Sequence, residues 1–178
     1  MIDSIVEVLK QGIMTIALLN PTVEDLRNDV YIDVPAFCMA QNIYHEARGE
    51  PRIGKIAVAH VTLNRVSHSS YPNTICDVVY DGPVSTWFLE ERNKIVPIRH
   101  GCQFSWWCDG RSDMVGDQEA WQDALNIALL VMARIELDPT NGATHYWNPD
   151  KVNKEPNWGY PVVAYIGDHI FCKRPSRA

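Results

Sequence analysis

The sequence predicts an α+β domain that is mainly helical and contains one small β-hairpin. Residues 35–66 and 117–137 place apolar side chains at helical spacing, whereas residues 162–172 change to two short strand-like runs separated by Gly167-Asp168. Of the 178 residues, 46% are hydrophobic and 21% are charged, as in an ordinary globular protein that buries a core. No repeat, low-complexity tract or linker interrupts the chain, so we expect a single domain over residues 1–178.

Residues 1–34 are predicted to form an N-terminal helical extension. Asp3 and Glu7 near its start, a short apolar run over residues 13–19 and the following Asn20-Pro21 do not give the pattern of a clear signal peptide. We expect a packed amphipathic helix, with a non-classical export signal as the alternative, and residues 22–25 resemble a capping box for a second short helix. No stretch approaches the length of a bilayer span, so stable membrane insertion is not expected. The apolar positions of the first helix are Ile2, Ile5, Val6, Leu9, Ile13 and Ile16.

A helix centred on residues 35–49 organises the rest of the sequence. Asp33 can cap this helix, Pro35 lies in its first turn, and Gly49 suits the C′ position that ends it. If the helix extends to residue 50, four side chains share one face: Met39, Ile43, Glu46 and Glu50.

Glu46 is the strongest candidate for chemistry in this helix. A carboxylate beside apolar side chains is partly removed from water, which raises its pKa from about 4.3 toward the range of a general acid. The alternative is a surface glutamate paired with Arg48 or Lys55, because ion pairs are common and catalytic residues are rare.

Four further segments precede the hairpin. A second helix is expected from Pro51 to Val66, with His60 as a hydrogen-bonded core histidine, and residues 75–80 fit either a strand or one helical turn. Residues 81–101 are aromatic and charged; they are either a lid or extra substrate wall, or a surface helix with a solvated face. A long helix is expected from residue 118 to about residue 137, with this inner stripe: Trp121, Leu125, Ala128, Leu129 and Met132.

Two clusters combine aromatic and polar side chains, at residues 103–107 and 144–149. Sugars offer flat C–H faces that stack on aromatic rings, and hydroxyls that bind amide and hydroxyl partners. The composition therefore suits a glycan groove, and the alternative at residues 103–107 is a short strand with one tryptophan buried. The candidate substrate-binding residues are Gln103, Ser105, Trp106, His145 and Tyr146.

The cysteines and histidines do not form a recognisable metal pattern. There is no C-x-x-C pair, and Gly49 follows His45-Glu46 where the second histidine of a zinc peptidase would stand, so we expect no metal and no cofactor. The odd number of cysteines leaves at least one thiol free or paired with another chain, and a Cys102–Cys108 bridge and reduced, buried thiols both stay open. A zinc amidase, or a cysteine–histidine peptidase using Cys38 or Cys102, has no supporting local signature.

Five blocks in series resemble the SleB-like cell-wall hydrolases, the family of spore cortex-lytic enzymes that also occurs in phages. The resemblance covers about residues 35–173. The blocks are Glu46-Ala-Arg-Gly-Glu-Pro51 with Gly54-Lys-Ile-Ala-Val-Ala-His-Val-Thr-Leu-Asn-Arg-Val66; Tyr71-Pro-Asn-Thr-Ile-Cys76-Asp-Val-Val-Tyr80; Cys102-Gln-Phe-Ser-Trp106 with Asp109-Gly110; Gly142-Ala-Thr-His-Tyr146; and Ile166-Gly-Asp-His-Ile-Phe171.

This resemblance implies a lysozyme-like catalytic domain that acts on peptidoglycan between N-acetylmuramic acid and N-acetylglucosamine. It favours a lytic transglycosylase in which Glu46 is the single catalytic carboxylate. A hydrolytic muramidase is the alternative, with Glu50 or Asp109 as a possible second carboxylate, because an inverting hydrolase needs two. A further alternative is a peptidoglycan-binding or virion structural module without catalysis.

Net charge limits the partners of the chain. At −6 it lacks the basic character of a nucleic-acid binder, so no nucleic acid is expected, and an anionic wall would have to be bound by a shaped groove. The expected partner is bacterial peptidoglycan, with synthesis in the cytoplasm and action at the cell wall. If the chain is phage-encoded, a holin would be the partner for its release.

Overall fold

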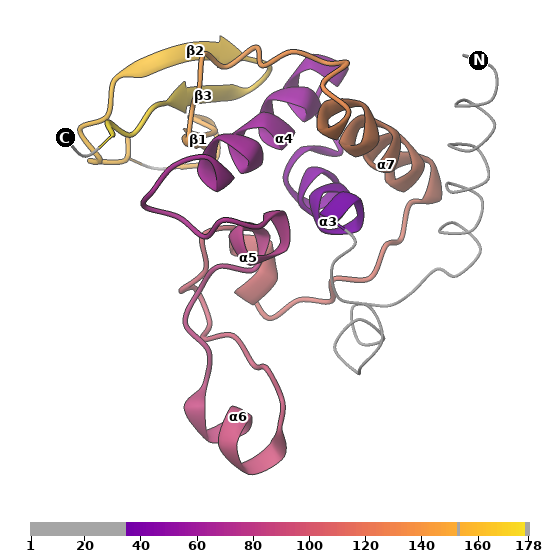
Figure 1. The fold of residues 1–178 in the computed structure, drawn as a ribbon, viewed down its shortest axis with the longest axis vertical. Coiled ribbons are helices and arrows are strands. Elements are labelled where there is room, and N and C mark those ends of the chain that lie inside the picture. The colour runs from indigo at the N-terminus through magenta and orange to yellow at the C-terminus, as the bar shows by residue number, and fades with distance from the viewer. Residues whose placement is uncertain (1–34, 153, 177–178) are drawn as a thin grey trace. The chain divides into compact units, whose positions relative to one another are not determined.

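The computed structural model describes residues 35–152 and 154–176 of the chain. The predicted N-terminal helix, the capping box at residues 22–25 and the Asp33 cap lie outside the described residues, so the single domain over residues 1–178 stays a prediction. In order, the elements are α3 (Pro35–Ala47), α4 (Arg52–Val66), α5 (Ile75–Val79), α6 (Thr86–Arg92), the 3-10 helix η1 (Ser105–Cys108), α7 (Gln118–Met132), β1 (His145–Trp147), β2 (Val162–Ile166) and β3 (His169–Cys172) (Figure 1). None of these helices is both long and apolar enough to cross a membrane.

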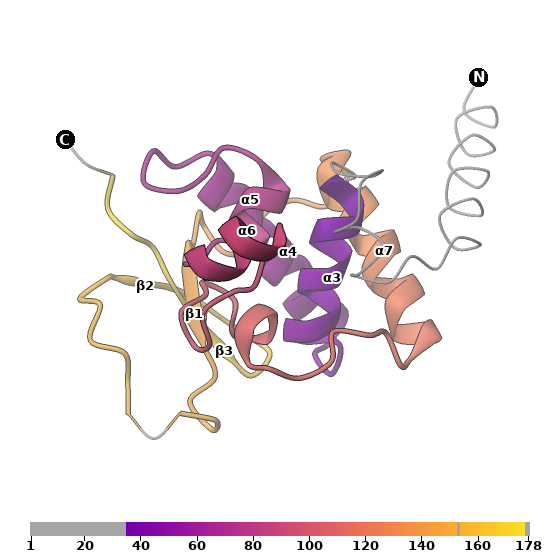
Figure 2. The same cartoon turned by 90° about the horizontal axis from the view of Figure 1, so that it is seen from below.

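The helices α3, α4 and α7 pack together on one side of a small sheet (Figures 1 and 2). The Phe37 ring of α3 meets the edge of Trp121 of α7 at 5.2 Å, and Met39, Ile43 and Leu125 are fully buried. At the surface, Lys55 of α4 forms an ion pair with Asp123 of α7 at 2.6 Å. The apolar side chains of the predicted α3 and α7 stripes therefore lie in the core, except that Leu129 and Met132 of α7 are only partly buried.

The sheet has three antiparallel strands in the order β1-β3-β2. The predicted hairpin is confirmed, because Ile166 pairs with His169 across a two-residue turn in which Gly167 has a positive φ of 58°. Ala57 and Val61 of α4 pack against Phe171 of β3, which fastens the sheet to the helices. The strand β1 was not predicted, since three residues are too few to establish an alternating pattern.

The end of α3 agrees with the predicted C′ position of Gly49, whereas the end of α7 differs from its prediction. The helix α3 ends at Ala47, whose carbonyl accepts a hydrogen bond from the Glu50 amide at 2.9 Å, so Glu50 leaves the face that Glu46 occupies. The helix α7 ends at Met132 rather than near Leu137. Arg134 has a φ of 58°, and Arg134 and Ile135 donate to the carbonyls of Val131 and Leu130, which is a Schellman ending.

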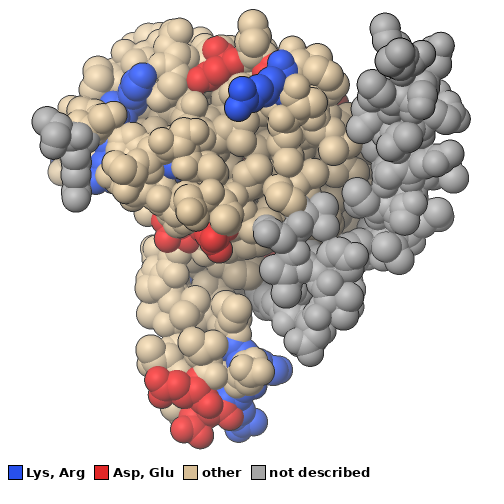
Figure 3. All heavy atoms as spheres, in the orientation of Figure 1, with Lys and Arg blue, Asp and Glu red and all other residues tan. Residues whose placement is uncertain are grey.

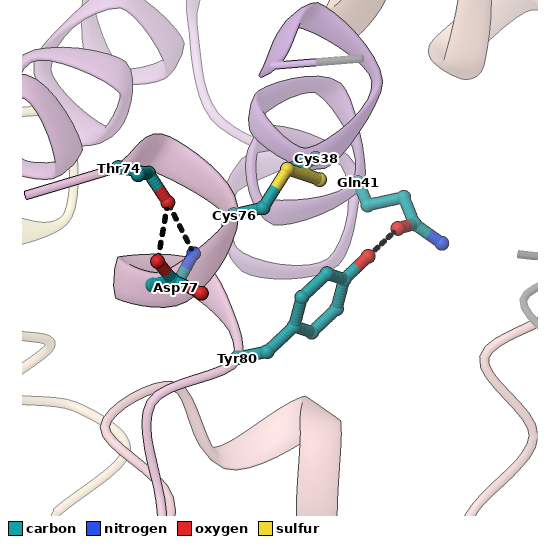
Figure 4. Close-up of a disulfide and its surroundings, with 6 residues drawn as sticks. All are labelled: Cys38, Gln41, Thr74, Cys76, Asp77 and Tyr80. Atoms are coloured by element: carbon teal, nitrogen blue, oxygen red, sulfur yellow. Dashed lines mark hydrogen bonds between the residues drawn. A yellow bond between two sulfur atoms is a disulfide. The ribbon is translucent and has the colours of Figure 1, made fainter. Parts of the chain in front are cut away.

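The helix α5 is the helical turn that the sequence left open. Its N-cap Thr74 accepts a hydrogen bond from the Asp77 amide at 3.2 Å (Figure 4). A disulfide between Cys38 and Cys76 joins α5 to α3, and the Tyr80 hydroxyl donates to the Gln41 side chain in the same region (Figure 4). The second disulfide links Cys102 with Cys108, and Cys172 is a buried free thiol.

Residues 83–98 form an arm that carries α6 away from the three packed helices (Figure 1). The arm is closed at its base by hydrogen bonds from Ser85 to Val96 and from Ile98 to Pro83, and no residue of α6 is buried. Acidic and basic side chains lie side by side at its tip (Figure 3). The structure thus agrees with a solvated surface helix rather than a substrate wall, as residues 83–101 line no part of the cavity described next.

Candidate active site

A cavity of about 660 Å³ lies where the end of α3, the η1 segment and the strand β1 meet. It is lined by seven of the predicted site residues and by several that were not predicted. The predicted residues are Glu46, Gln103, Ser105, Trp106, Asp109, His145 and Tyr146. The sequence blocks that are far apart along the chain therefore converge on one open concavity.

Glu46 lies in the last turn of α3 and is half-buried in this cavity. Its Oε2 accepts a hydrogen bond of 3.0 Å from the hydroxyl of Tyr146 on β1. Burial raises the pKa of Glu46, and this outweighs the opposing effects of the Tyr146 hydrogen bond and the positive charges of Arg65 and Lys151. A carboxyl group held in this way keeps its proton to higher pH than an exposed one, which is what a general acid requires.

Tyr146 and Arg65 both act on the Glu46 carboxyl, Tyr146 through a hydrogen bond and Arg65 through its charge. Burial, and then the Glu46 charge, raises the pKa of Tyr146 well above 10, so the hydroxyl stays a neutral hydrogen-bond donor. Arg65 of α4 is buried, its Nε donates to the Thr144 carbonyl at 2.7 Å, and its guanidinium lies 4.7 Å from the Phe104 ring centre. The site therefore contains a buried cation that can balance an ionised Glu46.

Arg65 was not predicted as a site residue. The signal was present, because Ala57, Val61 and Arg65 follow one another at four-residue spacing, so a charged residue continues an apolar helical stripe. A buried arginine at such a position needs a local partner, and here the Thr144 carbonyl beside the cavity supplies one.

Glu50, a possible second carboxylate, is placed elsewhere. It is buried under the β2–β3 turn, where its Oε2 accepts a hydrogen bond of 3.1 Å from the Asp168 amide. Its Oε1 lies 3.6 Å from His169 Nδ1, and the His169 ring meets the edge of the Tyr146 ring at 5.1 Å. Because α3 ends before Glu50, this carboxylate does not line the Glu46 cavity and supports the strand that carries Tyr146.

Asp109 is the carboxylate that does share the cavity with Glu46. Its Oδ1 accepts a hydrogen bond of 2.7 Å from the Arg111 amide, and its side chain is 28% exposed. It can therefore meet a substrate or a water molecule.

The predicted binding residues differ in how much of each faces the cavity. Gln103 and Ser105 are exposed on the rim. Trp106 is 7% exposed, because its Nε1 donates to Asn42 Oδ1 at 3.0 Å and its ring stacks on His45 at 4.5 Å. Trp107 is also 7% exposed and contacts the Tyr80 ring. The alternative of a short strand with one tryptophan buried was wrong, because residues 105–108 form the 3-10 helix η1 and both tryptophans are buried.

His145 lines the cavity between several aromatic side chains. Its Nδ1 lies 3.0 Å from the Thr144 hydroxyl and its Nε2 lies 3.4 Å from the Tyr71 hydroxyl. Burial, and then the charges of Arg65 and Arg174, lower the pKa of His145 to about 4, so the ring is neutral near pH 7. His60, in contrast, is a buried histidine whose Nε2 lies 3.0 Å from the Glu136 carbonyl, which confirms its structural role.

Within residues 35–152 and 154–176, no three histidine, cysteine, aspartate or glutamate side chains come close enough to form a metal site.

The chain is similar to known cell-wall enzymes over most of its described length. A family model described as Cell Wall Hydrolase matches residues 49–172, starting just after Glu46. The spore cortex-lytic enzyme of Bacillus cereus is 33% identical over 135 residues, which are 76% of this chain and 42% of that protein. The spore cortex-lytic enzyme of Halalkalibacterium halodurans is 34% identical over 145 residues, which are 80% of this chain and 36% of that protein. The chain thus spans well under half the length of the curated relatives that it matches.

Two solved structures have a similar fold. The catalytic domain of the Bacillus cereus SleB protein has a TM-score of 0.52 and 32% identity, with coverage of 82% of this chain and 94% of that one. The catalytic domain of the germination-specific lytic transglycosylase SleB from Bacillus anthracis has a TM-score of 0.50 and 31% identity, with coverage of 82% and 98%. The lysozyme-like α+β fold expected from the sequence is confirmed.

Proposed function

The chain belongs to the cell wall hydrolase family, and from this premise we propose that it cleaves the glycan strand of bacterial peptidoglycan between N-acetylmuramic acid and N-acetylglucosamine. The observation that carries the proposal is the half-buried Glu46 carboxyl, whose pKa is raised in an open cavity of about 660 Å³. The cavity is large enough for sugar rings, and the acid lies at its wall.

In the proposed reaction, Glu46 acts first as acid and then as base. It donates its proton to the glycosidic oxygen as the bond from that oxygen to muramic C1 breaks, which releases the N-acetylglucosamine hydroxyl. The resulting Glu46 carboxylate removes the proton from the muramic C6 hydroxyl, and that oxygen forms a bond to C1. The products are a 1,6-anhydro sugar and a free hydroxyl, no water is consumed, and Glu46 regains its proton.

The surrounding residues suit these two steps. Tyr146 donates a hydrogen bond to Glu46 Oε2 at 3.0 Å and so fixes the direction of the carboxyl group. The buried Arg65 charge stabilises the carboxylate that exists between the two steps. Gln103 and Ser105 are exposed on the cavity rim, where an amide and a hydroxyl can bind N-acetyl and hydroxyl groups of the substrate.

A hydrolytic muramidase is the second candidate, because Asp109 lines the same cavity as Glu46. In that mechanism Asp109 would activate a water molecule on the opposite face of the sugar, and a reducing sugar end would form. Glu50 is a poorer partner for this role, since its carboxylate accepts the Asp168 amide hydrogen bond outside the cavity.

Peptidoglycan lies outside the cytoplasm, so in this proposal the chain is made in the cytoplasm and acts at the wall. By analogy with phage lysis systems, a holin would provide its route if the gene belongs to a phage.

The test is a turbidity assay on purified peptidoglycan with the wild-type chain and the Glu46→Gln variant, each with and without a chelator. We expect the wild-type chain to lyse the wall equally in both conditions, and Glu46→Gln to lose lysis. Chelator-sensitive lysis would contradict the proposal in favour of a metalloenzyme, and binding without lysis by the wild-type chain would favour a module that only binds glycan.

A further inference from the structure

Trp158 is an exposed indole at the edge of the Glu46 cavity with no part in the reaction steps described above. It lies in the segment between β1 and β2, and 38% of its surface is exposed. Its side chain lines the Glu46 cavity of about 660 Å³ and also a neighbouring cavity of about 480 Å³. The indole therefore lies between the cavity that contains Glu46 and the neighbouring cavity.

Three aromatic rings hold this indole in place. Its centre lies 4.8 Å from the ring of His145 and 5.9 Å from the ring of Trp147, which it meets edge to face at 80°. The Tyr160 ring stacks on it with an interplanar angle of 27° at 6.4 Å. A ring that is packed on several sides is ordered before a ligand arrives, so binding to its free surface costs little conformational entropy.

Trp158 packs among aromatic rings, and polar side chains line the same cavity. His145, which supports the indole, is neutral near pH 7 because its pKa is about 4. Gln103 and Ser105 line the same cavity and are exposed. A pyranose ring matches this combination, since it presents an apolar C–H face to a flat aromatic surface and hydroxyl groups around its edge.

We propose that Trp158 is a saccharide-binding platform, on which a pyranose ring of the glycan strand adjacent to the cleaved bond stacks. The platform extends the binding surface past Glu46 into the neighbouring cavity, so the chain takes an oligosaccharide rather than a single sugar. The identity of the ligand as wall glycan rests on the proposed function, but the stacking surface itself does not depend on cleavage.

The experiment measures binding by calorimetry in a Glu46→Gln background, so that turnover cannot occur. The probe is the β-1,4-linked tetrasaccharide of N-acetylglucosamine, which carries no peptide. Adding Trp158→Ala should weaken binding about tenfold, equivalent to about 1.4 kcal/mol, and Trp158→Phe, which keeps a ring, should stay within about threefold. Circular dichroism and the thermal midpoint establish that both variants are folded.

Trp87→Ala is the matched control, because Trp87 is an indole of 54% exposure on the arm and does not line the Glu46 cavity. It should leave the affinity unchanged. The platform is ruled out by equal affinity of Trp158→Ala and its parent, by an equal loss in Trp87→Ala, or by no tetrasaccharide binding in the Glu46→Gln parent. Wall lysis by the chain with Glu46 intact tests the proposed function separately, so the two can fail independently.

Discussion

Burial favours the protonated form of Glu46, whereas three neighbouring groups favour its charged form. Burial is the largest of these effects and raises the pKa, with Tyr146, Arg65 and Lys151 acting against it. The fold would therefore be more stable with a neutral group at position 46. Such a conflict between function and stability is common at active sites.

Glu46→Gln is predicted to stabilise the fold increasingly as pH rises. Below the unfolded value of about 4.5, Glu46 is protonated in both states, so the two proteins should have similar midpoints. As pH rises through the raised folded pKa, the unfolded chain loses the proton more readily, and wild-type stability falls relative to the variant. Thermal midpoints of both proteins, measured from about pH 4, where Glu46 is mostly protonated in both states, to about pH 8, would test this. A difference that shrinks with rising pH would contradict the raised pKa.

Tyr146→Phe is predicted to move the alkaline limb of the pH–rate profile to higher pH. The tyrosine hydroxyl stabilises the Glu46 carboxylate by a 3.0 Å hydrogen bond, so its removal raises the Glu46 pKa further. Lysis rates across pH would show the shift. Tyr165→Phe is the control, since Tyr165 is 75% exposed on β2 and does not line the Glu46 cavity. An unshifted limb in Tyr146→Phe would show that another group limits the rate at alkaline pH.

Sequence reasoning located Glu46 for two reasons. Glu46 follows Ile43 at helical spacing, and it is the first residue of a block that resembles the family. Arg65 and Trp158 were missed for different reasons. Arg65 depends on the packing of α4 against β1 through the Thr144 carbonyl. Trp158 lies in a segment without periodicity, so its place at the cavity edge follows only from the path of the chain between β1 and β2.

At the scale of elements, the β2–β3 hairpin positions the active site through its contacts with Glu50 and Tyr146. Glu50 binds the turn amide of Asp168, and His169 at the start of β3 packs against the Tyr146 ring. The hairpin could be predicted from its two strand-like runs and Gly167-Asp168. Its docking onto Glu50 could not, because an extension of α3 to residue 50, which the sequence allowed, would place that carboxylate on the face of Glu46.

Glu50→Gln is predicted to reduce the lysis rate without changing the product, because Glu50 acts on Tyr146 through the hairpin. It should also lower the free energy of unfolding by about 1–3 kcal/mol, the usual cost of weakening a buried hydrogen bond to a charged group. Urea unfolding and wall lysis measure the two effects. Glu136→Gln is the control, because Glu136 pairs with the half-exposed Arg52 and should cost no more than about 1 kcal/mol. A changed product in Glu50→Gln would instead make Glu50 a catalytic group.

The two disulfides are predicted to contribute differently. Cys38–Cys76 spans 38 residues and should add about 4 kcal/mol to the free energy of unfolding, whereas Cys102–Cys108 spans 6 residues and should add about 2 kcal/mol. Loss of the Cys102–Cys108 bridge should reduce activity more than loss of Cys38–Cys76, because the smaller loop carries Ser105 and Trp106, which line the cavity. Urea unfolding and lysis by the two double serine variants would measure both. A larger loss of activity in the Cys38–Cys76 variant would contradict this division.

At the scale of the whole molecule, segments from across the chain build one cavity. The end of α3, the η1 segment and β1 each supply part of its wall, and residues 46 and 146 meet across a single hydrogen bond. The helical core could be predicted because α3, α4 and α7 carry strong periodic stripes. The convergence of the loops could be anticipated only from the family resemblance, because no local pattern fixes the distance between residues so far apart.

The amino-acid composition of the arm at residues 83–98 did not establish its role. Its tryptophan, phenylalanine and charged side chains fitted either a lid or a surface helix, and in the structure α6 buries no residue and the arm lines no part of the Glu46 cavity. Figure 3 also shows the basic side chains of this face in small separate groups rather than in one continuous patch. The described part of this face therefore offers no continuous basic surface to an anionic wall.

Mass spectrometry of the fragments released from purified peptidoglycan by the wild-type chain tests the central claim most directly. A single-glutamate transglycosylase forms the bond from muramic C6 oxygen to C1, so its fragments end in 1,6-anhydro-muramic acid and are lighter by one water than hydrolysis products. We predict that these ends dominate, and that the slower Glu50→Gln variant gives the same ends. Reducing-end muramic acid as the dominant product would contradict the account and make the chain a muramidase, with Asp109 as the first candidate for its second carboxylate.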